Sequence, residues 1–325
     1  MAKAIKKYNN NMKNIFKKTR QALSYMANMD DVVRYNLQRS LEEHKAATVR
    51  EMNVLQMQNQ NFTSMEMGVT DEKYCTSNVI VSLTSHSVRI YEAYIAIESI
   101  MRQTVKPNKI ILWLAEDEFT RENLPETLKR LQRRGLDVDF YKDIKSYKKL
   151  IPSLKKYPDD IIITVDDDII YQYDLIENLL NSYRQNPEMI HFCWGYKIKF
   201  KQDGTVDTYR NWGRIIENGS VDRLNFAHTG SALFPPHSLH AEVANESAFM
   251  SLSPHSDEVW IYAMSVMQGT LMKKAFTHHA NGMDYIKLTD EIQTKTTLWN
   301  YNRTGGKDEQ IKNVFQTYDI YDLIK

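Results

Sequence analysis

Short apolar runs alternate with segments of helical spacing from residue 78 onward. Runs of β-branched and apolar residues bounded by turn residues predict strands at residues 78–83, 109–114, 136–141 and 160–165. Between them, residues 90–101, 123–135 and 146–157 predict helices, with Gly135 ending the second and Pro152 kinking or restarting the third. This alternation over short connections predicts an α/β domain, with a mainly parallel sheet and helices on both faces.

The chain changes character near residue 70. Residues 1–70 contain no proline and one glycine, Gly68, and apolar residues recur there at helical spacing. This pattern predicts a helical N-terminal extension. Residues 71–325 then hold the α/β domain, whose regular alternation stops after residue 190; residues 196–210 predict a hairpin around Asp203-Gly204. We expect this second half to build against the sheet and not to form an independent domain.

Composition and charge narrow the class of protein. Of 325 residues, 42% are apolar and 26% are charged, and the net charge of +1 gives no argument for binding nucleic acid. No apolar run is long enough to span a bilayer, and the N-terminus lacks the apolar core of a secretory signal. Cys75 and Cys193 suit a reducing compartment. These features predict a cytoplasmic protein.

Three consecutive aspartates, Asp166, Asp167 and Asp168, follow the strand at residues 160–165. Adjacent buried carboxylates are unfavourable unless a cation neutralises them. In an extended strand, Asp166 and Asp168 would point one way and Asp167 the other. Ligands bind at this edge of parallel sheets, so two carboxylates here predict Mg²⁺ or Mn²⁺ with positions open for phosphate oxygens. The alternative is a solvated acidic turn before a helix capped by Asp174, and the apolar flanks favour the metal.

Five motifs, in order, resemble those of bacterial glycosyltransferases with the GT-A fold, related to glycosyltransferase family 2. The family's opening βαβ unit and its DxD segment are matched by VSLTSHSVRIYEAYIAIESI and by YPDDIIITVDDDIIY. Its later segments are matched by TGSALFPPHSL, SPHSDEVWIYAMSV and LWNYNRTGGKDEQ, so that the resemblance covers roughly residues 78–316. The departures are Gly230-Ser231 for a glycine pair, Asp257-Glu258 for an aspartate pair and Lys307 for an asparagine.

The resemblance implies a metal-dependent, inverting glycosyltransferase of the hexosyltransferase type. Residues 78–196 would form the half that binds a nucleotide-sugar donor, with a UDP-sugar as the default, and residues 197–325 the acceptor half. Asp166 and Asp168 would hold Mn²⁺ or Mg²⁺. The acceptor would be a glycan or a lipid-linked sugar in the assembly of bacterial surface polysaccharide, such as lipopolysaccharide or capsule.

Asp257 and Glu258 are the candidates for the base that deprotonates the acceptor hydroxyl. They follow Asp168 by 89 and 90 residues, about where inverting relatives carry their base. The same two acids suit the start of a helix, with Ser256 as its cap and both carboxylates complementing the helix dipole. These interpretations are compatible, and the sequence does not choose between the two acids.

Further candidates would contact the donor or the metal. Residues that could hold the base, ribose or phosphates of the nucleotide are Thr84, Ser85, Arg89, Lys148 or Lys149, Asp166 and Asp167. Arg89 and the lysines could equally be solvated surface charges. His278 and His279 could add a metal ligand or form a turn. Residues that could stack on sugar rings or belong to the core are Trp194, Trp212, Trp260 and Trp299.

Two other functions stay open at this point. A sugar nucleotidyltransferase also combines a Rossmann-like half with acidic metal ligands. It usually carries a glycine-rich phosphate loop, however, and the segment SLTSHSVR contains no glycine. A non-catalytic carbohydrate-binding scaffold with the same fold would not need both acidic clusters.

The first 30 residues carry seven basic side chains and no acidic one before Asp30. On a helix, one face would gather the apolar residues Ile5, Tyr8, Met12, Ile15, Phe16, Leu23 and Met26. A basic amphipathic helix suits an anionic membrane surface and predicts a peripheral location at the inner face of the cell membrane. A 3–4 spacing that continues to Leu37 and Leu41 equally predicts a coiled-coil stalk joining copies into a homo-oligomer.

Overall fold

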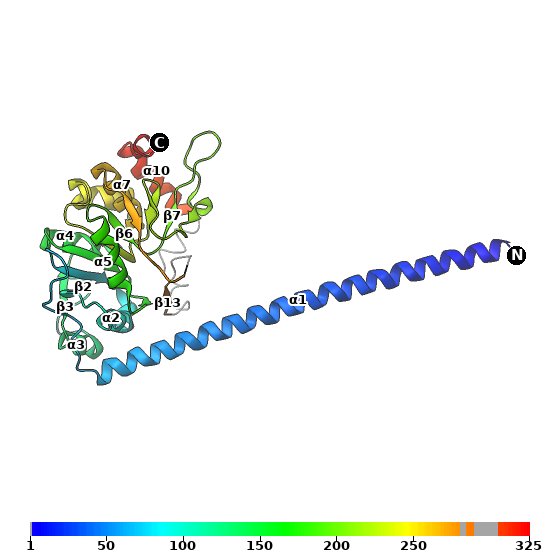
Figure 1. Ribbon diagram of the computed structural model, residues 1–325, viewed down its shortest axis with the longest axis horizontal. Helices are drawn as coiled ribbons and strands as arrows, with labels where there is room; N and C mark the ends of the chain where they lie inside the picture. The colour runs from blue at the N-terminus through cyan, green and yellow to red at the C-terminus, as the bar shows by residue number, and fades with distance from the viewer. Residues whose placement is uncertain (1, 280–283, 289–304) are drawn as a thin grey trace. The chain divides into compact units, whose positions relative to one another are not determined.

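A computed structural model describes residues 2–279, 284–288 and 305–325, except for the side chains of residues 2–16, 23 and 25–29. The chain divides into two compact units, Met1–Asn53 and Val54–Lys325. The first unit is helical and belongs to α1 (Ala2–Thr63), the long helix of Figure 1. The helix predicted for the extension is therefore present. The apolar face predicted from Ile5 to Met26 lies outside the described side chains. Within the described residues, no helix has the length and apolarity that crossing a membrane requires.

The last turns of α1 belong to the second unit. Met57 is fully buried and Asn61 is 2% exposed. The Asn61 Nδ2 group donates to Glu98 Oε1 at 3.3 Å, and Arg134 Nη1 approaches the same oxygen at 2.6 Å. The compact unit thus begins within α1, before the change in sequence character near residue 70.

The first half of the second unit follows the predicted order of elements. Parallel strands β3 (Leu136–Tyr141), β2 (Lys109–Ala115), β1 (Val79–Thr84) and β4 (Ile161–Val165) lie side by side in that order. Their connections contain η1 (Ser87–Tyr91), α2 (Ala93–Met101), α3 (Glu126–Gln132), η2 (Lys145–Lys149) and α4 (Ile151–Lys156). Pro152 stands in the first turn of α4, so the helical segment restarts there instead of continuing through the proline.

Short strands extend the sheet beyond β4. In the described residues the eight-stranded order continues with β11 (Ser231–Phe234), β6 (Ile190–Phe192), β12 (Met272–Lys274) and β9 (Val221–Asp222). Smaller sheets join β10 (Asn225–Ala227), β7 (Gly195–Lys197) and β8 (Gly213–Arg214), and β13 (Tyr285–Lys287) with β5 (Ile169–Tyr171). The predicted turn at Asp203-Gly204 is present: Gly204 has φ +80°, and a bridge joins Phe200 to Val206.

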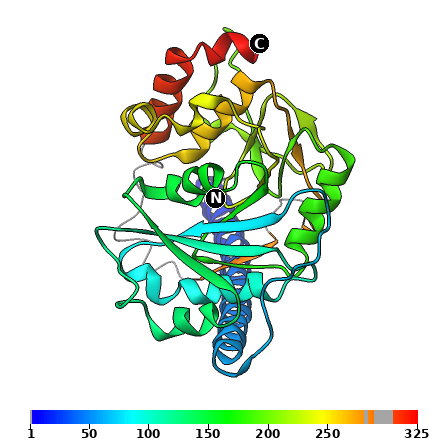
Figure 2. The same ribbon diagram turned by 90° about the vertical axis from the view of Figure 1, so that its left-hand side faces the viewer.

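Helices cover both faces of the sheet. Alternate residues of β1 enter opposite cores: Val79 and Val81 pack with α2, α3 and α5 (Leu175–Gln185), whereas Ile80 packs with residues of α4, α7 (Asp257–Gln268) and α10 (Lys307–Thr317). Figure 2 shows the cyan α2 and the yellow-to-red C-terminal helices on opposite sides of the strands. The remaining helical turns are η3 (Tyr209–Asn211), η4 (Ala241–Ala244), α6 (Glu246–Leu252) and α11 (Ile320–Leu323). The predicted fold class is confirmed as far as its elements go: a mainly parallel α/β domain with helices on both faces, preceded by a helical segment.

One reversed strand brings distant segments together. Strand β11 runs antiparallel to β4, with Ser231 opposite Val165. The residues before β11 therefore lie beside the residues after β4, at the same edge of the sheet as the end of β1. This edge collects the loop after β1, the aspartates, and the segment that leads into β11.

Candidate active site

The three aspartates occupy a turn between β4 and β5. The Tyr171 hydroxyl holds this turn by accepting from the Asp166 backbone N–H at 2.8 Å and donating to the Gly230 carbonyl. Because the chain is not extended here, the predicted alternation of faces is wrong. Asp167 and Asp168 contact one common cation, and Asp166 contacts another.

Arg89 of η1 neutralises Asp167 and Asp168. Its Nη2 atom lies 2.8 Å from Asp167 Oδ1 and 2.7 Å from Asp168 Oδ2. The Ser85 hydroxyl donates to the other oxygen of Asp167 at 2.6 Å. Burial raises the pKa of both carboxyl groups, while the charge of Arg89 acts in the opposite direction. Two of the predicted donor-binding residues, Ser85 and Arg89, are thus in direct contact with the aspartates.

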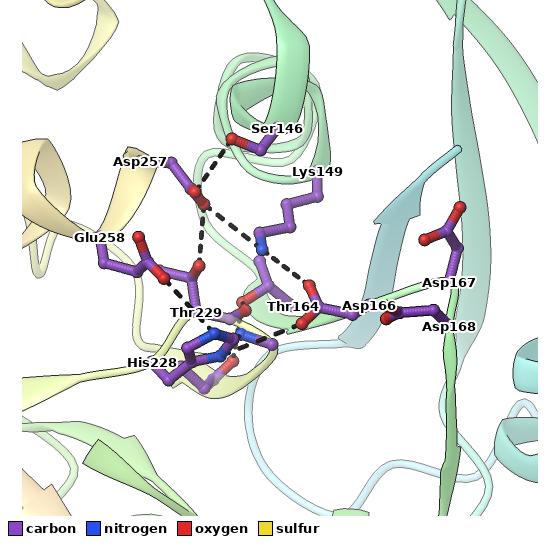
Figure 3. Close-up of polar contacts among 12 residues, drawn as sticks. Ser146, Lys149, Thr164, Asp166, Asp167, Asp168, His228, Thr229, Asp257 and Glu258 are labelled. Carbon is purple, nitrogen blue, oxygen red and sulfur yellow. Dashed lines mark hydrogen bonds and ion pairs between the residues drawn. The ribbon is translucent and has the colours of Figure 1, made fainter. Parts of the chain in front are cut away.

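Lys149 joins the aspartate turn to the second acidic pair. It is the last residue of η2, just before the restart at α4, and it is only 4% exposed. Its Nζ atom lies 2.9 Å from Asp166 Oδ1 and 3.4 Å from Asp257 Oδ2 (Figure 3). Burial would raise the pKa of Asp166, but the charge of Lys149 and its hydrogen bond to Asp166 lower it to about 2.

His228 enters the site from the segment before β11, and the sequence analysis missed it. Its ring stacks on Trp194 with centroids 3.6 Å apart. The Nδ1 atom accepts from the Gly230 backbone N–H at 3.0 Å, so a neutral ring carries its proton on Nε2. Burial lowers the pKa of His228, which favours this neutral form. The Nε2 atom lies 3.4 Å from Glu258 Oε1.

Asp257 and Glu258 start α7 and face the same cluster (Figure 3). Asp257 is held tightly: Ser146 donates to its Oδ1 at 2.9 Å, and Thr229 donates to its Oδ2 at 2.8 Å. The predicted helix start is confirmed, although the Ser256 side chain makes no capping hydrogen bond to the backbone.

The contacts of Glu258 are looser. His228, Lys307 and Ser256 each approach its carboxylate at 3.4 Å. Lys307 stands at the position where the resembling family has asparagine, and its ammonium group lies 4.2 Å from the centroid of the Tyr209 ring. Burial would raise the pKa of Glu258, but the charges of Lys307 and Lys149 lower it to about 2. Glu258 is therefore ionised at neutral pH.

Several other predicted residues contact different partners. The Thr84 hydroxyl donates to the Trp113 carbonyl at 2.8 Å, and Lys148 pairs with Asp143. His278 contacts Asp174 at 2.6 Å, and the His279 backbone N–H donates to Asp284 at 2.7 Å. Among the tryptophans, Trp212 and Trp260 are buried in the core, Trp194 stacks on His228, and Trp299 lies outside the described residues.

The aspartate turn fits the divalent cation that the resemblance implies. Asp166 and Asp168 offer the hard carboxylate oxygens that Mg²⁺ and Mn²⁺ prefer. In the described part of the chain, no three metal-ligating side chains gather into one group. Two carboxylates suit a cation that completes its coordination with water and substrate phosphates. Gly230 leaves room for one of these oxygens, because a Cβ atom there would lie 2.0 Å from Asp166 Oδ2.

The balance of charge supports the same fit. Among the ion pairs named above, five carboxylates lie beside three permanent cations, so the acidic side chains of this set outnumber the basic ones by two. The carboxylates belong to Asp166, Asp167, Asp168, Asp257 and Glu258, and the cations to Arg89, Lys149 and Lys307. A divalent cation would carry two positive charges, which equals the excess of acidic over basic side chains.

Comparison with known proteins finds likeness in structure only. No family model matches the sequence, and a search of curated protein sequences finds no match either. The mannosyltransferase PcManGT from Pyrobaculum calidifontis, in complex with GDP-Man and Mn²⁺, is similar at 12% identity and a TM-score of 0.38, over 71% of this chain and 63% of that one. S. aureus TarS 1-349 in complex with UDP is similar at 11% identity and a TM-score of 0.41, over 61% of this chain and 57% of that one.

A nucleotidyltransferase shares the likeness. The CMP:2-keto-3-deoxy-manno-octonic acid synthetase complexed with CTP is similar at 10% identity and a TM-score of 0.34, over 62% of this chain and 89% of that one. Because all three TM-scores lie below 0.5, these structural likenesses carry no part of the proposed function.

Proposed function

We propose that the protein is a metal-dependent glycosyltransferase that transfers a sugar from a nucleotide-diphosphate donor with inversion. The observation that carries this proposal is the chain of contacts from Asp166 through Lys149 and His228 to Asp257 and Glu258. It places a carboxylate turn suited to a metal-diphosphate next to a second carboxylate suited to an acceptor hydroxyl. Such a pair of anionic centres is what an inverting displacement requires.

The donor would bind over the ends of β1 and β4, where parallel sheets bind ligands. Asp166 and Asp168 would hold Mn²⁺ or Mg²⁺. When bound, this cation would stabilise the negative charge that develops on the leaving diphosphate. A UDP-sugar is the default donor, on the strength of the family resemblance. Ser85 and Arg89 lie at the same edge, within reach of a donor phosphate or ribose.

Glu258 is the better candidate for the base. Both oxygens of Asp257 already accept hydrogen bonds shorter than 3 Å, whereas His228, Lys307 and Ser256 each lie 3.4 Å from the Glu258 carboxylate. In the transfer step, the acceptor oxygen forms a bond to the anomeric carbon while its proton moves to Glu258. The bond from the anomeric carbon to the phosphate oxygen breaks, and its electron pair leaves with the nucleoside diphosphate. One such displacement inverts the anomeric carbon.

The other residues hold this geometry. The Nε2 atom of His228 lies 3.4 Å from Glu258 Oε1, and Lys149 is anchored between Asp166 and Asp257. We assign Asp257 to positioning Lys149. The acceptor would be a glycan or a lipid-linked sugar in the assembly of bacterial surface polysaccharide. The protein would be located in the cytoplasm, at the inner face of the cell membrane. Residues 1–70 would serve as membrane-surface or oligomerisation segment, and residues 71–325 as catalytic domain.

A screen of sugar nucleotides with Mn²⁺ tests the proposal. We expect one donor to release its nucleoside diphosphate slowly in the absence of acceptor, and Asp168→Asn or excess EDTA to stop the release. The product formed with an acceptor would have the inverted anomeric configuration by NMR. Release of pyrophosphate would instead indicate a nucleotidyltransferase. Binding of sugars without any release would indicate a non-catalytic scaffold.

A further inference from the structure

One nitrogen atom of Arg89 forms ion pairs with two carboxylates at the aspartate turn. Its Nη2 atom lies within 2.8 Å of both Asp167 Oδ1 and Asp168 Oδ2. The side chains are largely buried, at 20% exposure for Arg89, 9% for Asp167 and 24% for Asp168. Carboxylates in such a setting need a compensating charge, and the guanidinium supplies it. Arg89 thus supplies part of the neutralisation expected of a metal ion.

Arg89 and a metal ion would compete for the same oxygen. A cation bound to Asp168 Oδ2 at about 2.1 Å, the distance typical of Mg²⁺, would lie no more than about 4.8 Å from Nη2 as that atom now stands. Two positive centres so close repel strongly in a buried site. The metal therefore binds well only if the guanidinium moves to another anion.

A donor diphosphate would be that other anion. Arg89 belongs to η1, directly after the end of β1, at the sheet edge where donor phosphates are expected. The Ser87 backbone N–H donates to Glu118 Oε1 at 2.6 Å, which holds the backbone of η1 while the long Arg89 side chain can turn. A planar guanidinium binds phosphate oxygens in pairs, at least as well as it binds carboxylates.

We propose that Arg89 is an exchangeable counter-ion that makes metal and donor bind cooperatively. In the donor-free protein it occupies Asp167 and Asp168 and weakens the binding of a metal ion on its own. When metal and diphosphate arrive together, the metal neutralises the aspartates and Arg89 transfers to the diphosphate. By linkage, the diphosphate must strengthen metal binding by the same factor by which the metal strengthens diphosphate binding. This inference rests on the proposed function, because it assumes a metal at the aspartate turn.

Direct titration of Mn²⁺ tests the inference without any turnover. The Mn²⁺ affinity of the full-length protein is measured by the EPR signal of free Mn²⁺, alone and with UDP or GDP, for wild type, Arg89→Gln and Arg89→Lys. We expect UDP or GDP to strengthen Mn²⁺ binding to the wild type by about tenfold or more. Arg89→Gln should bind Mn²⁺ alone about tenfold more tightly than wild type, bind the nucleotide more weakly, and keep only the cooperativity that comes from direct contact between metal and phosphate.

The control variants separate charge from shape and from general damage. Arg89→Lys keeps the charge, so Mn²⁺ alone should bind as weakly as in wild type, while the paired contacts to phosphate are lost. Arg133→Gln removes an exposed arginine that pairs with Glu126, and it should change nothing. If Arg89→Gln binds Mn²⁺ alone no more tightly than wild type, the inference is wrong and the metal site stands. If wild type binds no Mn²⁺ with or without nucleotide, both the proposed metal site and the inference about Arg89 are wrong.

Discussion

Asp257 and Glu258 are neighbours in the sequence but differ in how their oxygens are held. Asp257 accepts from Ser146 and Thr229 at normal hydrogen-bond distances and also contacts Lys149, whereas His228 and Lys307 lie 3.4 Å from the Glu258 carboxylate. A carboxylate that is saturated with donors keeps a structure in place. A loosely held one can accept the proton of an incoming hydroxyl. This difference could not be predicted from the sequence, because it depends on side chains of η2 and of the segment before β11.

We predict that Glu258→Gln lowers kcat by a factor of about 100 or more, the usual contribution of a general base, with little change in donor KM. Asp257→Asn should instead weaken the anchoring of Lys149, lowering the melting temperature and donor affinity together. Steady-state kinetics with a matched thermal melt measures both variants. Near-native kcat in Glu258→Gln would refute this choice of base.

Lys307 tunes the acid that it faces. It is the first residue of α10, where the helix dipole disfavours a positive charge, and it is nevertheless buried against Glu258 and Tyr209. A residue that conflicts with its own helix often has a functional reason. Because Lys307 lowers the pKa of Glu258, it keeps this carboxylate ionised down to lower pH, and it also makes the carboxylate a weaker base.

Lys307→Met should raise the pKa of Glu258, and a base must be ionised to act. The acidic limb of the kcat/KM profile should therefore move to higher pH by about one unit or more. In wild type, the depressed pKa means that Glu258 contributes stability above its ordinary value of 4.5, and this contribution disappears as the pH falls towards 2. The exposed Lys312 of the same helix supplies the control Lys312→Met. An unchanged pH profile in Lys307→Met would show that this ion pair plays no part in the proton transfer.

The elements that the sequence predicted best are the longest and most regular ones. Strands β1 to β4 were visible as runs of apolar residues, and β1 and β4 ended where the candidate chemistry begins. The short strands after residue 190 carry almost no periodic signal, since several of them span only three residues. His228 was missed for this reason: its place depends on β11 pairing antiparallel with β4, and the pairing of such short strands is set by tertiary contacts.

Strand β11 approaches the aspartate turn through a glycine. A Cβ atom at Gly230 would lie 2.0 Å from Asp166 Oδ2 and 2.7 Å from its Cγ, so the carboxylate or the strand would have to move. The close approach to Asp166 therefore explains why a glycine stands at this position of the TGSALFPP motif. The same motif supplies Thr229, which holds Asp257.

We predict that Gly230→Ala weakens Mn²⁺ binding by about tenfold or more. A steric cost of about 1.4 kcal/mol in the binding free energy corresponds to a tenfold loss of affinity. Gly213→Ala is a matched control, because a Cβ atom at Gly213 would meet nothing within 4 Å. Both variants are titrated with Mn²⁺ in the presence of UDP or GDP. Equal affinities in the two variants would mean that Asp166 does not need its present position to bind the metal.

At the scale of the whole molecule, the boundary between the two units, Met1–Asn53 and Val54–Lys325, falls within α1. Residues up to Asn53 form a unit of their own, but Met57 and Asn61 belong to the core of the second unit. Composition changes near residue 70 and cannot reveal this boundary, because a helix can cross from one unit into the next without any break in its sequence pattern. Glu98 and Arg134 form a buried ion pair beside Asn61, so the last turns of α1 help to satisfy a buried charge.

Two deletions separate the roles that we propose for α1. Removing residues 1–30 takes away seven basic side chains, each contributing about 1 kcal/mol near an anionic surface. This deletion should abolish sedimentation with anionic liposomes at low salt and leave donor hydrolysis intact. Removing residues 1–63 also deletes Met57 and Asn61, and should lower the melting temperature by at least about 5 °C. A full-length protein that stays in the supernatant would exclude the membrane role. If the full-length protein elutes as an oligomer and the protein without residues 1–30 elutes as a monomer, α1 is an oligomerisation stalk.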